Sequence, residues 1–281
     1  MSDSLARIAA ALERLSPPPP PAVDPLAHPA YAWRDSVLTA AAGFAPQPLD
    51  RLIGIDRQKA ALVANLAHLS EGHAAHDVLL WGARGTGKSA LVKSAVAAIQ
   101  TRSGALALVQ VAQTADLPAL FARLAAVPRA FAVFIDDLGF DGPGEARTLR
   151  SVLEGGAEGR PPNARLIVTA NRRHLLPRDI AEQSGAAAGT AAGAWSDARA
   201  INPRDAVDDQ LALADRFGLS LGFHALDQDG YLAIVQGYAT AHHLPFDASA
   251  AVQWATQRGS RSGRVAWQYI VEVAGRTGRA L

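Results

Sequence analysis

The sequence of 281 residues contains no cysteine, one methionine and 6% aromatic residues. The lack of cysteine excludes a disulfide framework, a thiolate nucleophile and a zinc site built from cysteines. No apolar run approaches the roughly 18 residues that indicate a membrane-spanning helix. Residues 1–16 carry Asp3 and Glu13 and lack the continuous apolar segment of a secretory signal. We therefore expect a cytoplasmic protein without membrane contact.

The chain also lacks an excess of charge of either sign, because 27 basic residues oppose 26 acidic ones and the net charge is +1. Bulk electrostatics therefore gives no support for binding to nucleic acid. Lysine is scarce, since Lys59, Lys88 and Lys93 are the three in the sequence and arginine carries the remaining positive charge. A lysine inside a recognisable motif is thus a strong candidate for a chemical role.

Alanine is abundant, with 60 residues, and favours helices and close packing. Residues 3–15 have apolar side chains at helical spacing and predict an amphipathic helix. Residues 17–21 are five prolines, which predict an extended spacer, and residues 31–42 predict a further helix. Residues 1–49 are therefore expected to form an N-terminal helix on a proline-rich arm. This helix packs on its own domain or docks to a partner.

From residue 50 onward apolar runs alternate with helical patterns, which is typical of an α/β domain with a largely parallel sheet. After residue 224 only helical patterns remain, so we expect an α/β core at 50–224 and a helical lid at 225–281. Residues 184–194, rich in glycine and alanine, predict a mobile surface loop. The expected strands are 77–81, 105–111, 131–135, 165–170 and 219–223, and the expected helices are 56–69, 88–100, 117–126, 145–154, 206–217, 228–242, 248–257 and 264–275.

A glycine-rich loop follows the first expected core strand and has the pattern G-x-x-x-x-G-K-S, the Walker A motif or P-loop. Its glycines let successive backbone N–H groups surround a phosphate, and the N-terminus of the next helix faces the same anion. Lys88 is predicted to contact the β- and γ-phosphates of ATP, and the Ser89 hydroxyl to bind Mg²⁺. The predicted phosphate-binding residues are Gly82, Gly85, Thr86, Gly87, Lys88, Ser89 and Ala90.

Polar side chains end two other expected strands. Asp136 and Asp137 follow an apolar run, where a P-loop site requires an acid that holds Mg²⁺. Asp136 is predicted to take this Walker B role, and Asp137 to orient or deprotonate the attacking water. The same pair would alternatively cap the next helix. Asn171, at the end of the next strand, is predicted to contact the γ-phosphate or the water, and would alternatively form a turn.

These elements, in this order and followed by a helical domain, resemble the AAA+ ATPase superfamily. The stretch L-D-R-L-I-G-I-D before the first core helix is similar to the segment that flanks adenine in that family, which implies Ile53 and Gly54 as adenine contacts. The resemblance identifies Asn171 with the family's sensor 1. It also implies that Arg216, in L-A-D-R-F-G, is an arginine finger that reaches a neighbouring subunit. Arg216 is alternatively a surface ion-pair partner of Asp215 or Asp209. Arg264 is implied as sensor 2, with Arg261 as the alternative.

More narrowly, the segments GIDRQKA, LLWGARGTGKSALVK and LADRFGLSLGF resemble a bacterial family of predicted ATPases called domain of unknown function 815, over about residues 30–275. One feature departs from the superfamily pattern. Most AAA+ members have Asp-Glu at the end of the acidic strand, whereas this chain has Asp136-Asp137. Aspartate is one methylene shorter, so it holds the water less well. The Asp-Asp form is also similar to replication initiators and helicase loaders.

The expected function is Mg²⁺-dependent ATP hydrolysis that drives remodelling or assembly of a macromolecular partner. The expected active form is a homo-oligomer, either a ring or another assembly. One alternative is a slowly hydrolysing module that ATP switches between binding states. Another is a DNA-associated ATPase similar to helicase loaders. Nucleic acid is a weaker candidate partner than protein. Its sequence support is a lid cluster, which consists of Arg258, Arg261, Arg264, Trp254 and Trp267.

Overall fold

The computed structural model describes residues 7, 23–139, 143–155, 160–171 and 215–281. The predicted helix over 3–15, the proline run and the loop at 184–194 lie outside these residues, apart from Arg7. The predicted helix over 206–217 also lies outside them, except for its last three residues, which are turn and bend.

One seven-stranded sheet organises the core, in the order β2-β1-β4-β5-β6-β3-β7. All neighbouring strands run parallel except β1 and β2, which form an antiparallel pair. Central strands such as β3 are buried on both faces and are therefore continuously apolar, which is typical of parallel sheets. The strands are β1 (Ala30–Arg34), β2 (Val37–Ala40), β3 (Val78–Gly82), β4 (Leu106–Val111), β5 (Ala130–Leu138), β6 (Ala164–Asn171) and β7 (Leu219–Phe223).

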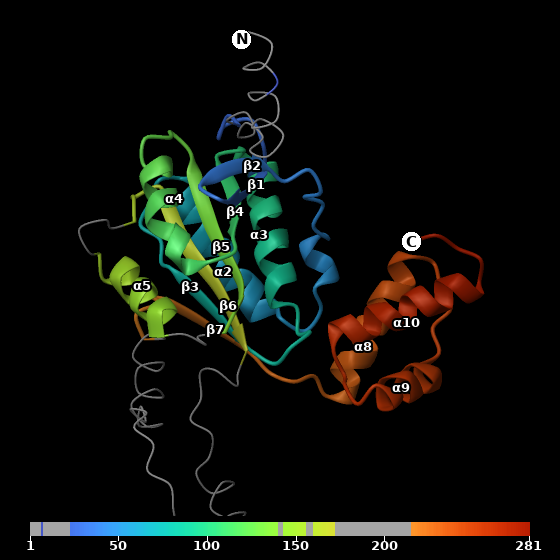
Figure 1. Ribbon diagram of the computed structural model, residues 1–281. Coiled ribbons are helices and arrows are strands. Elements are labelled where there is room, and N and C mark those ends of the chain that lie inside the picture. The colour runs from blue at the N-terminus through green and yellow to red at the C-terminus, as the bar shows by residue number, and fades with distance from the viewer. Residues whose placement is uncertain (1–6, 8–22, 140–142, 156–159, 172–214) are drawn as a thin grey trace, which may run out of the picture.

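Helices cover both faces of the sheet (Figure 1). One buried apolar cluster joins α2 and α3 to one face, and a second joins α4 and α5 to the other. The core helices are α2 (Asp56–Ser70), α3 (Lys88–Ser103), α4 (Leu117–Leu124) and α5 (Pro143–Glu154), with short 3-10 helices η1 (Leu49–Arg51) and η2 (Thr114–Asp116). The described core is therefore a three-layer α/β structure, and its α/β class and largely parallel sheet agree with the prediction from the sequence.

The C-terminal residues form a small helical lid with its own apolar core (Figure 1). Its helices are α8 (Gln228–Ala241), α9 (Ala248–Gln257) and α10 (Gly263–Arg276). Each begins after a side-chain cap: Asp227, Asp247 and Ser262 accept hydrogen bonds from backbone amides three residues onward. These caps explain why the three helices begin within one residue of the predicted positions. Within the described residues, no helix is long and apolar enough to span a membrane.

The prediction of a helix over residues 31–42 was wrong. This stretch is a β-hairpin of β1 and β2, because Asp35 and Ser36 adopt φ angles of 50° and 60°, as in the tight two-residue turns that join antiparallel strands. β1 also pairs in parallel with β4, so part of the expected arm lies inside the sheet. The Arg129 guanidinium donates to the carbonyl oxygens of Pro25, Leu26 and His28, which ties the preceding segment to the core. The alanines favoured a helix locally, but pairing with β4 overrides that preference.

Candidate functional site

The P-loop connects β3 to α3. Gly85 and Gly87 adopt φ angles of 75° and 93°, and Gly87 is the N-cap residue of α3. Positive φ is readily available to glycine, so these residues let the chain turn back and expose its amides. A side chain at Gly82 would overlap the backbone of Phe223 in β7, so this glycine is needed for strand packing.

The Lys88 side chain is buried at the base of the loop. Its ammonium group donates hydrogen bonds to the carbonyl oxygens of Gly82 and Ala83, at 3.0 and 2.8 Å. Burial lowers the pKa of Lys88 below its ordinary value, although Asp137 and Asp136 oppose this effect. A phosphate near the loop would stabilise the charged lysine, so the site favours an anionic ligand.

Asp136 lies at the C-terminal end of β5, beside the first turn of α3. Its Oδ1 accepts hydrogen bonds from the hydroxyls of Ser89, at 2.5 Å, and Thr169, at 2.6 Å. The structure therefore brings together the two residues that were predicted to bind Mg²⁺. A hydroxyl and a carboxylate are oxygen donors that suit this hard cation, and P-loop sites complete its shell with phosphate and water. Within the described residues, no group of three or more His, Asp or Glu forms a separate metal site.

Asp137 occupies an irregular position where β5 pairs with β6. The register shifts between Ile135 and Leu138, and Asp137 has a φ of 56°. Its Oδ1 accepts a hydrogen bond of 2.5 Å from the side-chain amide of Asn171, and its Oδ2 lies 3.6 Å from the Arg84 guanidinium. The predicted water-orienting pair is thus in direct contact, and a P-loop arginine lies beside it.

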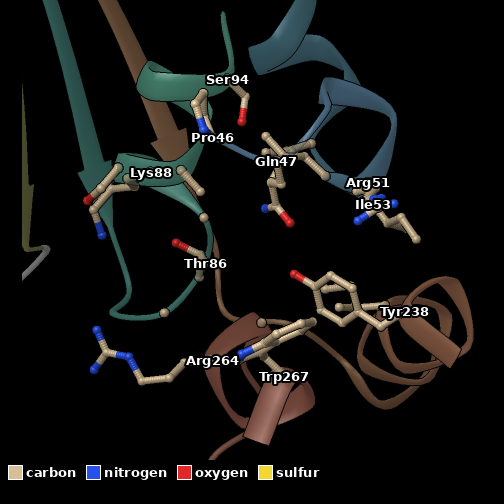
Figure 2. A pocket seen from close by; sticks show the side chains of 18 of the residues that line it. Pro46, Gln47, Arg51, Ile53, Thr86, Lys88, Ser94, Tyr238, Arg264 and Trp267 are labelled. Carbon is tan, nitrogen blue, oxygen red and sulfur yellow. The ribbon is translucent and has the colours of Figure 1, made fainter. Parts of the chain in front are cut away.

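A cavity of about 610 Å³ lies between the P-loop and the lid (Figure 2). Its volume is within the range of small-molecule sites. The predicted residues Ile53, Thr86, Lys88, Ser89 and Arg264 line it, and so do Gly85, Gly87 and Ala90. The described lining does not include Gly54, Asp136, Asp137 or Asn171. The three polar residues contact each other or Ser89 at the ends of β5 and β6.

An aromatic wall closes the lid side of the cavity. The Tyr238 and Trp267 rings lie 5.3 Å apart in an edge arrangement, and the His242 ring is 5.5 Å from Trp267. Figure 2 shows Tyr238 and Trp267 across the cavity from Thr86 and Lys88. Burial raises the pKa of Tyr238, so its hydroxyl stays neutral and can donate a hydrogen bond. Such a wall suits a planar ring at the end of a ligand whose anionic part lies on the loop.

The lid touches the P-loop directly through the first residues of α10. The Gly263 amide donates a hydrogen bond of 2.9 Å to the Gly85 carbonyl. A side chain at Gly85 would lie 2.9 Å from Cβ of Ser262, so there is no room for one. Arg264 is among the described cavity-lining residues and Arg261 is not, which supports Arg264 as the sensor 2 candidate.

Arg216 lies far from its own P-loop. Leu219 of β7 pairs with Val78 and Phe223 pairs with Gly82, so the residues before β7 lie at the N-terminal ends of these strands, whereas the P-loop follows the C-terminal end of β3. The five residues of β7 separate the two ends by about 13 Å. The Arg216 Nε atom lies 2.6 Å from a carboxylate oxygen of Glu154, at the end of α5. Arg216 is therefore in an ion pair, with Glu154 as a partner that the sequence did not indicate, and its position is also compatible with action on another subunit.

Sequence reasoning missed several residues of this site. Tyr238 and Gln47 line the cavity but belong to no recognised motif. Trp267 was assigned to a nucleic-acid cluster, whereas its ring lines the cavity. Thr169 could have been found, because it precedes Asn171 by two residues and alternate residues of a strand share a face.

A family model described as "Protein of unknown function (DUF815)" matches residues 26–277. A comparison with curated proteins finds no significant match. Among solved structures, the Holliday junction branch migration motor RuvB of Thermotoga maritima is 18% identical with a TM-score of 0.51, over 84% of this chain and 68% of that one.

Two Aeropyrum pernix proteins are also similar. The ORC2 protein in ADPNP–ADP complexes is 14% identical with a TM-score of 0.53, over 85% of this chain and 66% of that one. The ORC1 protein in complex with DNA is 16% identical with a TM-score of 0.52, over 80% and 61%. This chain therefore covers less than two thirds of both ORC chains. The chain belongs to the DUF815 family, and its fold is that of the AAA+ P-loop ATPases.

Proposed function

We propose that this protein binds ATP between core and lid, hydrolyses it with Mg²⁺, and couples the reaction to remodelling or assembly of a macromolecular partner. The observation that carries the proposal is the contact between α10 and the P-loop at the mouth of one cavity. A ligand on the loop would touch both domains, so its binding and breakdown would change how the lid sits.

The parts of ATP match the parts of the cavity. Lys88 and the loop amides would hold the phosphates, since the Lys88 ammonium lies at the base of the loop. The base would lie toward Tyr238, Trp267 and Ile53, which line the other end. Gly54 would shape the backbone beside the base, and Arg264 would contact phosphate from the lid.

The reaction would rely on positioning and charge. Ser89 and Asp136 would hold Mg²⁺, which when bound neutralises charge on the phosphates. Asp137 would orient the attacking water, and Asn171 would hold Asp137 through the hydrogen bond between their side chains.

We further propose that the active form is a homo-oligomer. Because Arg216 precedes the end of β7 that lies away from its own P-loop, as an arginine finger it would act on the site of another subunit. An arginine supplied in trans stabilises the charge of the transferred phosphoryl group. We also propose that the chain is divided into an arm at 1–49, a core at 50–224 and a lid at 225–281. The β1–β2 hairpin is then the part of the arm that joins the core sheet.

Phosphate release by the purified protein, with and without Mg²⁺, tests this function. Lys88→Ala should abolish nucleotide binding, and Asp136→Asn should retain binding but lose turnover by at least about 100-fold. Lys59→Ala is the matched control, since Lys59 pairs with Asp56 outside the cavity. If the protein binds nucleotide but shows no phosphate release that depends on Lys88 and Asp136, it is not an ATPase.

One observation favours the slow, ATP-switched module as a second candidate. Asp137 is short and its carboxylate is already engaged by Asn171 and Arg84. If these contacts persist with ATP bound, water is poorly oriented and the protein acts through its bound state. If this second candidate is correct, the Arg84→Ala variant should hydrolyse ATP faster than the original protein while its ATP affinity stays nearly unchanged.

A DNA-associated role receives less support from the site. The Arg258 guanidinium stacks 3.3 Å from the centre of the Trp254 ring, whereas Arg264 and Trp267 line the cavity, so the lid cluster is divided. The similar ORC1 structure is a complex with DNA. A DNA mobility shift at low salt that Arg258→Ala and Arg261→Ala abolish would favour this role, and no binding would exclude it.

A further inference from the structure

Two consecutive aspartates of β5 are held from two alternate residues of β6. Thr169 contacts Asp136, and Asn171 contacts Asp137. Neighbouring residues of a regular strand point to opposite faces, so one face of β6 could not ordinarily reach both. The register shift and the φ of 56° at Asp137 remove this restriction.

The Thr169 hydroxyl has a defined direction in this arrangement. Its Oγ1 lies 2.8 Å from the backbone amide nitrogen of Asp137, which can only donate. The hydroxyl proton is therefore free to go to Oδ1 of Asp136, 2.6 Å away. Thr169 is 1% exposed, so water does not replace either bond. One buried hydroxyl thus links the side chain of Asp136 to the backbone of Asp137.

We propose that Thr169 is a positioning residue, whose hydroxyl holds the bulge of β5 and thereby sets the carboxylates of Asp136 and Asp137. The inference rests on the proposed function, in which Asp136 binds the cation and Asp137 orients water. Groups that orient a metal ligand typically change metal affinity or activity by about 10–100-fold when they are removed. Left-handed backbone at a residue other than glycine is costly and persists only where its surroundings support it.

The test compares Thr169→Val, which removes the hydroxyl from a side chain of nearly the same shape, with Thr169→Ser, which keeps it. Binding of Mn²⁺, as a stand-in for Mg²⁺, is followed by electron paramagnetic resonance in the presence of ADP. Thr169→Val should weaken Mn²⁺ binding by at least about 10-fold and change metal-free ADP affinity by less than about 3-fold. Thr169→Ser should stay within about 3-fold of the original protein on both measures.

A second readout needs neither metal nor nucleotide. Hydrogen exchange at the Asp137 amide should be slow in the original protein and in Thr169→Ser, and at least about 10-fold faster in Thr169→Val. Thr39→Val is the matched control, since that hydroxyl bonds to Ala32 in the distant hairpin. Should Thr169→Val fail to fold, Thr169→Cys replaces the hydroxyl with a weakly bonding thiol.

Three results would overturn the inference: unchanged Mn²⁺ affinity in folded Thr169→Val or Thr169→Cys, equal impairment in Thr169→Ser, or rapid exchange of the Asp137 amide in the original protein. A failure of the proposed function looks different. In that case the original protein shows no metal-dependent ADP binding and no turnover, while the exchange measurement still tests the link between Thr169 and Asp137.

Discussion

The backbone amide of Gly263 hydrogen-bonds the carbonyl oxygen of Gly85 at 2.9 Å, so the first residue of α10 is attached to the P-loop. No side chain separates the two segments, because Gly85 and Gly263 both lack one. The loop that would hold phosphate and the helix that would carry sensor 2 therefore move together unless this contact breaks.

Replacing Gly85 with alanine should separate lid and loop. The new methyl group would lie 2.9 Å from Ser262, and the φ of 75° strains any residue with a side chain. We expect a loss of about 1–3 kcal/mol in unfolding free energy and at least a 10-fold loss in ATP affinity. Calorimetric unfolding and nucleotide titration measure both. Gly43→Ala, where nothing lies within 4 Å, should change neither, and equal effects at the two glycines would contradict the role of this contact.

Trp267 should report nucleotide binding by fluorescence. Its ring lines the cavity and contacts Tyr238 and His242 at their edges, so a bound base would change its surroundings. We expect the fluorescence change on adding ADP to disappear largely in Trp267→Phe. Trp33→Phe, which removes an indole buried in the core away from the cavity, should preserve the change. A signal that survives Trp267→Phe would place the base elsewhere.

The dependence of ATP affinity on pH should reveal Lys88. Burial lowers the pKa of Lys88 below its ordinary value of 10.5, so as the pH rises the free protein loses this charge earlier than an exposed lysine would. Bound phosphate, in contrast, stabilises the protonated form. Binding therefore takes up a proton once the pH exceeds the lowered pKa, and affinity falls as the pH rises further. Titrations between pH 7 and 10 measure the fall. Lys88→Arg should bind more weakly but without this decline, because arginine stays charged.

Mixing two inactive variants should restore turnover if Arg216 acts between subunits. Arg216→Ala should lower kcat by at least about 100-fold and leave ATP affinity within about 3-fold. Lys88→Ala lacks a working P-loop but retains Arg216. In mixed oligomers the loop of one variant meets the arginine of the other, so phosphate release should exceed the sum of the separate activities. Absence of any recovery, with mixed oligomers shown by cross-linking, would contradict the assignment.

The ion pair between Asp77 and Arg160 should influence how the free energy of unfolding depends on pH. Asp77 is buried, and its second oxygen accepts a hydrogen bond from the Leu166 amide. Burial raises the pKa of Asp77, the opposing effect of Arg160 being smaller, so its stabilising contribution is greatest below pH 3.8 and declines as the pH rises through the raised pKa.

Arg160→Met would leave the Asp77 carboxylate unpaired and should cost about 3 kcal/mol at pH 7. Urea unfolding should show that this variant recovers stability, relative to the original protein, when the pH falls to 5. Adding Asp77→Asn, which keeps an oxygen for Leu166, should recover most of the loss at pH 7. A pH-independent loss in Arg160→Met would show that lost packing, and not the charge, is responsible.

Local signals were sufficient for much of this molecule. The P-loop glycines, the apolar strands and the capped lid helices each carry their own pattern, so their positions were predicted within a few residues. The hairpin at Asp35 and Ser36 was missed because its first strand, β1, pairs with β4, whose residues lie 78 positions later in the sequence. The alanine-rich stretch alone could not indicate that pairing.

The chemistry of the site was predicted where a motif names it and missed where only the fold brings residues together. Ser89 and Asp136 meet as the motifs imply. Tyr238 and Trp267 lie on two lid helices whose packing orients both rings toward the core, which no spacing rule reveals. The left-handed conformation of Asp137, whose backbone amide donates a hydrogen bond to Thr169 of β6, was equally hidden.

Strand β7 connects the region of Arg216 to the P-loop and the lid. Phe223, at one end, packs against Gly82 without room for a methyl group, and the chain then enters the lid. Arg216 precedes the other end by only a few residues. Under the proposed function, a nucleotide-driven shift of lid or loop along this strand would be transmitted as a rigid displacement to the arginine offered to the next subunit. Neighbouring subunits of an oligomer would then hydrolyse ATP one after another rather than independently.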